Sequence, residues 1–285
     1  MPATLDSGQA FQWVPLAPRI YRGWVVDRLY RLDQTSVPEI RVSSPHPGGW
    51  NELSEYLQID FPMARVRDEL RALDPFLARA IQFCPGLRLL KQDPWECLAG
   101  FILSSTKSIV GIRQVWHRIC RCFGESIEWE GERQHRFPRP EAIARVHETA
   151  LRGCAMGFRA KYISAAARAI ASGRLDLRLP LELSASEARA YLMRLPGVGE
   201  KIADCVLLFA YQKYECFPRD RWIDRVLREI YFPRREPSVD ELKAFIRSHF
   251  GPRAGIAQQF LFHYVRMRPE SLARRSDRMT ARHAN

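Results

Sequence analysis

The fold is decided by the stretch Arg194-Leu195-Pro196-Gly197-Val198-Gly199-Glu200-Lys201-Ile202-Ala203-Asp204-Cys205. An amphipathic helical pattern runs from 184 to about 195, and Pro196 with the two glycines breaks it. A second apolar helix is predicted to begin at about Glu200. Because glycine tolerates positive φ, the two glycines allow a tight turn and let another backbone approach closely.

The start of the second helix predicts an anion-binding site. The backbone amides after Gly197 point off the helix N-terminus, where unpaired N–H groups and the helix dipole attract a phosphate. A helix-hairpin-helix of this kind, built on Gly197, Val198 and Gly199, grips a DNA backbone without reading the bases. The glycine pattern alone favours an ordinary helical hairpin with a glycine-rich connection.

Two side chains near the hairpin could carry chemistry. Lys201 lies in the first helical turn, where the dipole and an adjoining apolar face disfavour the charged amine. A neutral amine is a nucleophile that can form a Schiff base, whereas the alternative is a snorkelling surface lysine. Asp220 precedes another helical pattern and is predicted to cap it. Its second carboxylate oxygen could exchange protons with Lys201 or stabilise positive charge on a sugar.

These residues resemble the helix-hairpin-helix Gly/Pro…Asp superfamily of DNA glycosylases, and within it the 8-oxoguanine DNA glycosylases. Four more segments match in family order: SGQAFQW (7–13), RLLKQDP (88–94), GFRAKY (157–162) and AGIAQ (254–258), followed by Phe262. The resemblance therefore covers the chain from about 5 to 264. It implies a bifunctional enzyme that flips and excises 8-oxoguanine from duplex DNA, with Lys201 as nucleophile, Asp220 assisting and β-elimination nicking the strand.

The resemblance also implies a base pocket. The Gly8 carbonyl accepts a hydrogen bond from N7–H of the oxidised base, which undamaged guanine lacks because its N7 is an acceptor. Gln258 reads the Watson–Crick edge of the base. Phe262 stacks on one face, and Cys205 lies against the other. Cys205 fits the description of a small core residue equally well.

Other residues are implied to contact the DNA around the lesion. Phe158 is a wedge that enters the vacated stack and Arg159 reaches the opposite strand, although a surface turn would also explain both. Thr106 and Gly111 replace an Asn and an Arg that read the opposite cytosine in familiar eukaryotic members, and Arg113 could substitute for them.

The metal and cofactor expectations follow from the same residues. A cation could bridge the hairpin backbone at Gly197 and Gly199 to a phosphate, and neither another metal nor a cofactor is expected. The seven cysteines are scattered and odd in number, which indicates reduced thiols and gives no support for an iron–sulfur cluster.

The composition limits the class of partner that the protein can bind. The 285 residues carry a net charge of +12, rich in arginine, which suits a polyanion. No apolar run approaches membrane-spanning length and no signal peptide is evident, so we expect an intracellular monomer that acts on double-stranded DNA containing oxidised guanine.

The predicted fold class is α+β. Short β-prone runs at 20–26, 29–32 and 40–42 indicate an antiparallel β domain over residues 1–57. Helical patterns then follow through 58–265, as two helical subdomains with the active site between them, and a basic tail over 266–285 is expected to be disordered.

Two other functions remain open from the residues. One is a glycosylase of the same superfamily for another damaged base, which would normally lack the lysine or carry a cluster. The other is a non-catalytic helix-hairpin-helix protein, which would need neither Lys201 nor Asp220.

Overall fold

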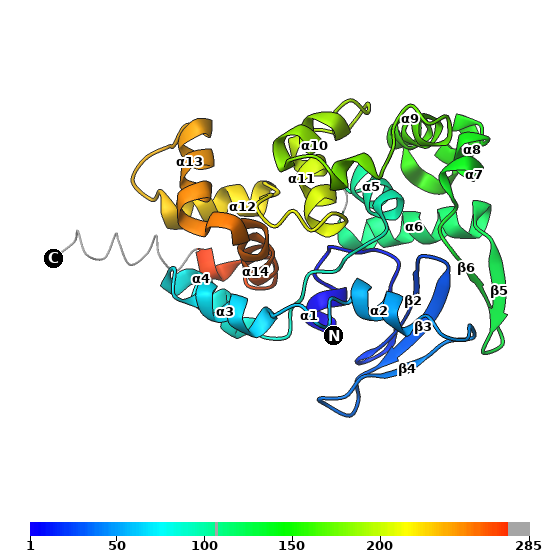
Figure 1. The fold of residues 1–285 in the computed structure, drawn as a ribbon, viewed down its shortest axis with the longest axis horizontal. Coiled ribbons are helices and arrows are strands. Elements are labelled where there is room, and N and C mark those ends of the chain that lie inside the picture. Colours follow the sequence, from blue (N-terminus) through cyan, green and yellow to red (C-terminus); the bar gives the residue numbers. More distant parts are fainter. Residues whose placement is uncertain (106–107, 273–285) are drawn as a thin grey trace.

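The chain folds as an antiparallel sheet beside a mainly helical region, which confirms the predicted α+β class (Figure 1). The structure is a computed structural model that describes residues 1–105 and 108–272. The elements of the N-terminal part are α1 (Pro2–Leu5), β1 (Val14–Ala17), β2 (Ile20–Val25), β3 (Arg28–Asp33), β4 (Arg41–Ser43) and α2 (Trp50–Tyr56).

The sheet is a meander in the order β1-β2-β3-β4, and each neighbouring pair is antiparallel. β2, β3 and β4 correspond to the three predicted β-prone runs. The strand β1 was not predicted, because it lies at an edge, contains Pro15 and leaves three of its four residues exposed, so it lacks an apolar alternation. Trp13, Tyr30 and Tyr56 form the centre of a small core under the sheet.

The segment 7–13 is tied to the segment 88–94 by one buried glutamine. The Gln9 amide donates to the Arg88 carbonyl (2.9 Å) and accepts from the Leu90 N–H (2.8 Å). The Gln92 amide donates back to the Gln9 carbonyl at 2.7 Å. Two stretches that are distant in sequence are thereby fixed against each other, and the loop that begins with Ser7 is anchored on the helical region.

The helical region follows α2 and also contains two short strands. Its elements are α3 (Met63–Arg71), α4 (Pro75–Phe83), α5 (Pro94–Leu103), α6 (Ile109–Phe123), β5 (Ser126–Trp129), β6 (Glu132–His135), α7 (Pro140–Ala144), α8 (Glu148–Leu151), η1 (Arg152–Met156), α9 (Arg159–Ala171), η2 (Leu179–Leu181), α10 (Ala185–Leu192), α11 (Glu200–Phe209), α12 (Arg221–Val226), η3 (Leu227–Tyr231), α13 (Val239–Phe250), η4 (Gly251–Arg253) and α14 (Ala254–Met267).

The helices gather in two groups, with α3, α4 and α12–α14 on one side and α5–α11 on the other (Figure 1). One continuous cluster of buried apolar side chains nevertheless runs through both groups. Several helix starts follow the predicted chemistry. The Asp93 carboxylate accepts from the Glu96 N–H at 2.9 Å, and Ser184 with Glu187 forms a complete capping box at the start of α10.

The hairpin β5–β6 was not predicted, because its two strands are short and mostly polar. It is attached to the N-terminal sheet by ion pairs from Arg22 to Glu132 (2.6 Å) and from Arg31 to Glu130 (3.1 Å). These pairs connect the two halves of the fold.

Ordered structure continues past the boundary expected at 265. Helix α14 extends to Met267, and Leu272 is buried in the main core. The rest of the expected tail, 273–285, lies outside the described residues. Within 1–105 and 108–272, no helix is long and apolar enough to cross a membrane.

Candidate active site

The hairpin turn, residues 193–199, joins α10 to α11 as predicted. Gly197 has φ +82°, and a Cβ there would lie 2.5 Å from the Tyr162 ring, so only glycine fits. The positive φ that the glycine pattern allows is found at Gly197, whereas Gly199 is extended (φ −100°) and caps α11. A Cβ on Gly199 would meet no atom within 4 Å, so nothing inside the described protein requires glycine there.

The backbone donors of the hairpin turn differ from one another. The Val198 N–H donates to the Leu195 carbonyl (3.1 Å), and the Val198 side chain is buried. For the amides of Gly197 and Gly199, no acceptor is found among the described residues. The free donors that could meet a phosphate are therefore on the two glycines, and Val198 holds the turn.

Lys201 and Asp220 lie at the starts of two helices. Lys201 is exposed in the first turn of α11, so the apolar contact expected for its amine is absent around the described side chain. Asp220 caps α12 as predicted, since its Oδ1 accepts from the N–H groups of Trp222 (3.1 Å) and Ile223 (2.9 Å). Burial raises the pKa of the Asp220 carboxyl, and the cation of Lys201 opposes that rise. The two groups thus interact electrostatically.

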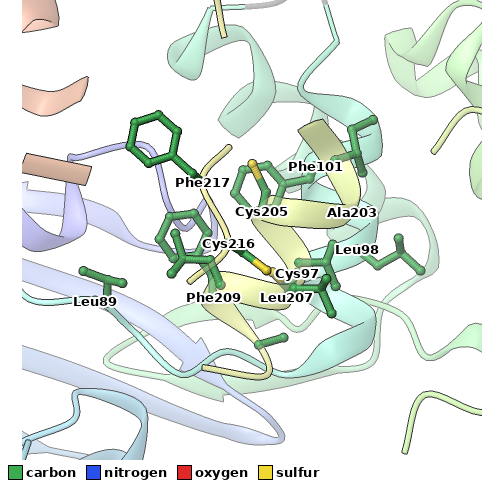
Figure 2. Close-up of a cluster of buried hydrophobic side chains, with 14 of the residues drawn as sticks. Leu89, Cys97, Leu98, Phe101, Ala203, Cys205, Leu207, Phe209, Cys216 and Phe217 are labelled. Carbon is green, nitrogen blue, oxygen red and sulfur yellow. The ribbon is translucent and has the colours of Figure 1, made fainter. Parts of the chain in front are cut away.

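Cys205 lies one turn after Lys201 on α11, with only 4 % of its surface exposed. Figure 2 shows it within the buried cluster between α5 and α11, which includes Phe101 and Phe209. Burial raises the pKa of the Cys205 thiol, which favours its neutral form. A core position is thus its observed role, and contact with a base stays a prediction.

A second group of predicted residues meets beside the N-terminal loop. Gly8 has φ +86°, and a Cβ on it would lie 3.6 Å from the ring of Phe262 and 2.4 Å from the side chain of Ile109. Gln258 precedes Phe262 by one turn of α14 and is buried. Its Oε1 has no hydrogen-bond partner among the described residues, and a buried polar atom without a partner is costly. Ile109 was not predicted, because an isoleucine carries no chemical signal in a sequence.

Helix α14 connects the two groups. The Gly255 N–H at its start donates to the Tyr214 carbonyl (2.7 Å), in the loop that follows α11. Helix α12, capped by Asp220, packs on α14. Side chains from the hairpin and from the Gly8 side of the molecule are therefore carried by adjoining helices.

Of the two predicted wedge residues, Phe158 is exposed as expected and Arg159 is not. Phe158 follows Gly157 (φ +58°) and is 49 % exposed. Arg159 is buried, and it donates to the Ser105 carbonyl and to the Met156 carbonyl (3.3 Å). Its guanidinium lies 4.5 Å from the centre of the Phe158 ring, and burial lowers its pKa. Arg159 thus braces the loop at Ser105, and it would have to exchange these bonds to reach an opposite strand.

Two other positions near that loop had been expected to face DNA. Thr106 lies outside the described residues. The expectation that Arg113 could replace the missing readers is wrong for the observed side chain. Arg113 donates to the Leu5 carbonyl (2.7 Å) and pairs with the Asp6 carboxylate (2.9 Å), so it is engaged with the N-terminal loop.

The metal-binding side chains give no alternative site. Within the described ranges, no group of three or more His, Cys, Asp or Glu side chains is arranged to hold a metal ion. All seven cysteines fall within those ranges and are free thiols. The groups that the described site offers are the Lys201 amine, the Asp220 carboxylate, the Gln258 amide and the Phe262 ring.

Comparison with known proteins gives the same assignment over residues 1–252. Residues 1–98 match the family described as 8-oxoguanine DNA glycosylase, N-terminal domain, and residues 99–252 match the HhH-GPD superfamily base excision DNA repair protein. A probable N-glycosylase/DNA lyase of Methanothermobacter thermautotrophicus is 33% identical over 213 residues, which is 68% of each chain. An N-glycosylase/DNA lyase OGG1 of Arabidopsis thaliana is 28% identical over 278 residues, 92% of this chain and 76% of that protein.

A solved structure extends the agreement to three dimensions. It is the Clostridium acetobutylicum 8-oxoguanine glycosylase/lyase in complex with double-stranded DNA containing cytosine opposite 8-oxoguanine, and it superposes with a TM-score of 0.87 at 30% identity. The match covers 93% of this chain and 91% of that one. The chain therefore belongs to the HhH-GPD superfamily of base excision DNA repair proteins, and within it to the 8-oxoguanine DNA glycosylase/lyases.

Proposed function

We propose that this enzyme excises 8-oxoguanine from double-stranded DNA and nicks the strand, with Lys201 as the nucleophile. The observation that carries this proposal is that Lys201 and Asp220 lie at the starts of two helices, close enough for the lysine charge to act on the carboxyl, while the Asp220 helix packs on α14, which carries Gln258 and Phe262. A non-catalytic DNA-binding protein would need the helix cap at Asp220 but not the nearby lysine that acts on its carboxyl. The family assignment adds that the base is an oxidised guanine.

Base selection rests on the Gly8 side of the site. A flipped 8-oxoguanine stacks on the half-buried ring of Phe262, and its Watson–Crick edge meets the Gln258 amide, whose Oε1 otherwise has no partner among the described residues. The oxidised base carries a hydrogen on N7, which donates to the Gly8 carbonyl. Guanine presents an acceptor at N7, so the same carbonyl would face a lone pair. Cys205 would close the opposite face of the pocket at its α11 edge.

The chemical step uses the neutral amine of Lys201. Its nitrogen attacks C1′ of the sugar, the N-glycosidic bond breaks, and the electron pair leaves with the base, which takes up a proton. The carboxylate of Asp220 accepts the proton that the amine loses and stabilises the positive charge developing on the sugar. The sugar ring then opens: the C1′–O4′ bond breaks, O4′ takes up a proton, and the nitrogen forms an imine with C1′. The imine acidifies C2′, so that loss of a C2′ proton breaks the C3′–O bond and releases the 3′ phosphate by β-elimination.

DNA is held by contacts that do not depend on base sequence. The free amides of Gly197 and Gly199 would meet a phosphate at the start of α11, where a bound cation could share the contact. Phe158 would fill the gap left by the flipped nucleotide. A monomer suffices for this arrangement, and we propose that it works inside the cell, where the DNA is.

The proposal is tested by trapping the covalent intermediate. Borohydride reduction during turnover on a duplex with 8-oxoguanine should give a protein–DNA adduct with the wild type, and Lys201→Gln should give none. Lys91→Gln is the matched control, because Lys91 is also a solvent-accessible lysine but pairs with Glu55 in the N-terminal part. An adduct that persists in Lys201→Gln would show that another residue is the nucleophile.

A panel of duplexes separates the competing functions. The wild type should cleave the 8-oxoguanine duplex and leave duplexes with alkylated bases or mismatched adenine intact. Cleavage of an alkylated duplex instead would assign the enzyme to another base. Binding without cleavage of any duplex would make it a structural DNA-binding protein.

A further inference from the structure

The Gly8 loop, residues 5–8, is held by side chains from elsewhere in the molecule. Its first three main-chain carbonyls all accept from such side chains: Leu5 O from Arg113 (2.7 Å), Asp6 O from Arg266 (2.6 Å) and Ser7 O from Gln259 (3.4 Å). Arg113 comes from α6, and the other two donors come from α14.

The next carbonyl in the series, that of Gly8, is different. No donor among the described residues reaches it. Three consecutive acceptors are thus satisfied by the protein, and the fourth stays available to a ligand. This arrangement fixes the direction of the Gly8 carbonyl through the three peptide groups before it.

Holding the loop with two arginines has a cost in free energy. Arg113 pairs with the Asp6 carboxylate while Arg266 donates to the Asp6 carbonyl, and the Nε atoms of both guanidiniums are buried without partners among the described residues. Burial lowers the pKa of Arg266, and the nearby charge of Arg113 lowers it further. Apolar side chains would cover the loop without bringing two cations together.

Arg266 also reaches the second base contact. Its guanidinium carbon lies 5.7 Å from the centre of the Phe262 ring, and Gly8 lies against the same ring. A single side chain therefore touches both the loop that offers the acceptor and the ring that offers the stacking face. The distance between these two surfaces decides whether a planar base fits both at once.

We propose that Arg266 is a positioning residue, which with Arg113 and Gln259 sets the Gly8 carbonyl against the Phe262 ring and thereby sets the preference for 8-oxoguanine over guanine. The inference rests on the base-binding roles proposed above for Gly8 and Phe262. It assigns to α6 and α14 a share in base selection that acts through the N-terminal loop. A displacement of about 1 Å at a reacting geometry can lower a rate by about 10²-fold.

The test compares two substrates that differ only in the base. Arg266→Met keeps the length of the side chain and removes its donors. In single-turnover assays at saturating enzyme, excision of 8-oxoguanine should fall by about 10²-fold, because the acceptor loses its direction. Cleavage at a pre-formed abasic site should stay at the wild-type rate, since no base has to be recognised there.

Three further variants show whether the effect of Arg266→Met comes from its lost hydrogen-bond donors. Arg266→Lys retains a donor and should recover part of the lost excision. Gln259→Leu removes only the Ser7 contact and should show the same pattern more weakly, and it carries the test if Arg266→Met does not fold. Arg268→Met is the matched control, because Arg268 is exposed and pairs with Glu270.

Two results would overturn the positioning role. Equal losses on the 8-oxoguanine and abasic substrates would make Arg266 a structural residue, and unchanged excision in Arg266→Met would remove it from base selection. Failure of the underlying function would look different, because then the wild type itself would not excise 8-oxoguanine.

Discussion

The hairpin turn and the Gly8 loop are both short, both contain a glycine with positive φ, and both leave backbone groups unpaired within the described structure. In the hairpin turn the unpaired groups are N–H donors, and Gly199 faces open space. In the Gly8 loop the unpaired group is a carbonyl acceptor, packed against Phe262 and Ile109 and braced through its neighbours by α6 and α14.

With the roles proposed above, this difference would separate holding DNA from choosing a base. Donors at a helix start suit any phosphate, so they need no precise surroundings. A single acceptor that must distinguish N7–H from a bare N7 needs a fixed direction, which explains the buried side-chain bonds around residues 5–7. Variants of the two regions should therefore fail in different ways.

The largest effect is expected between the two regions, at Asp220. Asp220→Asn keeps an oxygen that caps α12 and removes the charge, so it should lower the single-turnover rate by about 10²–10⁴-fold with little change in DNA affinity. Burial raises the pKa of the Asp220 carboxyl, so the wild-type rate should fall on acidification at a higher pH than an ordinary aspartate would give. Asp220→Asn should lose that acidic limb.

Asp224→Asn provides the control for this variant. Asp224 lies on the same helix but pairs with Arg219 at 2.8 Å, so its loss should not change the acidic limb. If Asp220→Asn weakened DNA binding as much as it lowered the single-turnover rate, Asp220 would be only a helix cap. DNA binding and catalysis would then not depend on different residues.

A smaller effect is expected at Gly8. Alanine in its left-handed conformation costs about 1–2 kcal/mol, and the new Cβ meets Ile109. The carbonyl should turn, so excision of 8-oxoguanine should fall roughly tenfold, as that strain energy implies, with abasic cleavage unchanged. Gly48→Ala is a matched control, because Gly48 also has positive φ but a Cβ there meets no atom within 4 Å. Equal losses on both substrates would place Gly8 outside base selection.

The hairpin turn should respond in the opposite way. Gly199→Asp puts a negative charge where a phosphate would bind, so lesion-containing and undamaged duplexes should be weakened alike. The salt dependence of binding should drop by roughly one phosphate contact. Gly199→Ala should bind like the wild type, because φ −100° suits alanine and its Cβ has open space. A loss confined to the lesion duplex would assign the hairpin to the base pocket.

The sequence predicts the hairpin region more completely than the Gly8 loop. Breaks in the helical pattern and capping residues are local signals, so α10, α11 and the capping role of Asp220 were predicted correctly. Which of the two glycines takes the positive φ could not be predicted from their spacing, because that depends on the path of the turn against Tyr162: Gly197 takes it and Gly199 does not.

The remaining features depend on contacts between distant segments. Arg113 looked like a free base on α6, and only the folded chain brings it to Asp6. Arg266 fell in an expected tail, yet α14 continues through it. The burial of Arg159 under Phe158 likewise follows from the path of η1, which periodicity cannot reveal.

The smallest effect is expected for selection of the base opposite the lesion. The residues that would face this base belong neither to the hairpin turn nor to the Gly8 loop. By the family resemblance, Thr106 and Gly111 stand where familiar eukaryotic members carry an Asn and an Arg that read cytosine, and Arg113 is held by the Gly8 loop. Each bidentate base contact is worth about 1–3 kcal/mol of discrimination, so without these readers the preference for cytosine should be nearly flat.

Measurement of single-turnover excision opposite C, T, G and A tests this, with binding to undamaged duplex as the reference. Arg159 is the remaining candidate reader, but it must first leave the Ser105 and Met156 carbonyls. If the wild type proves strongly restricted to cytosine, Arg159→Lys decides whether that exchange occurs: loss of the restriction would make Arg159 a reader that is released from its brace on binding. An unrestricted wild type would instead leave Arg159 as a brace for the loop at Ser105, and base choice would rest on Gly8, Gln258 and Phe262.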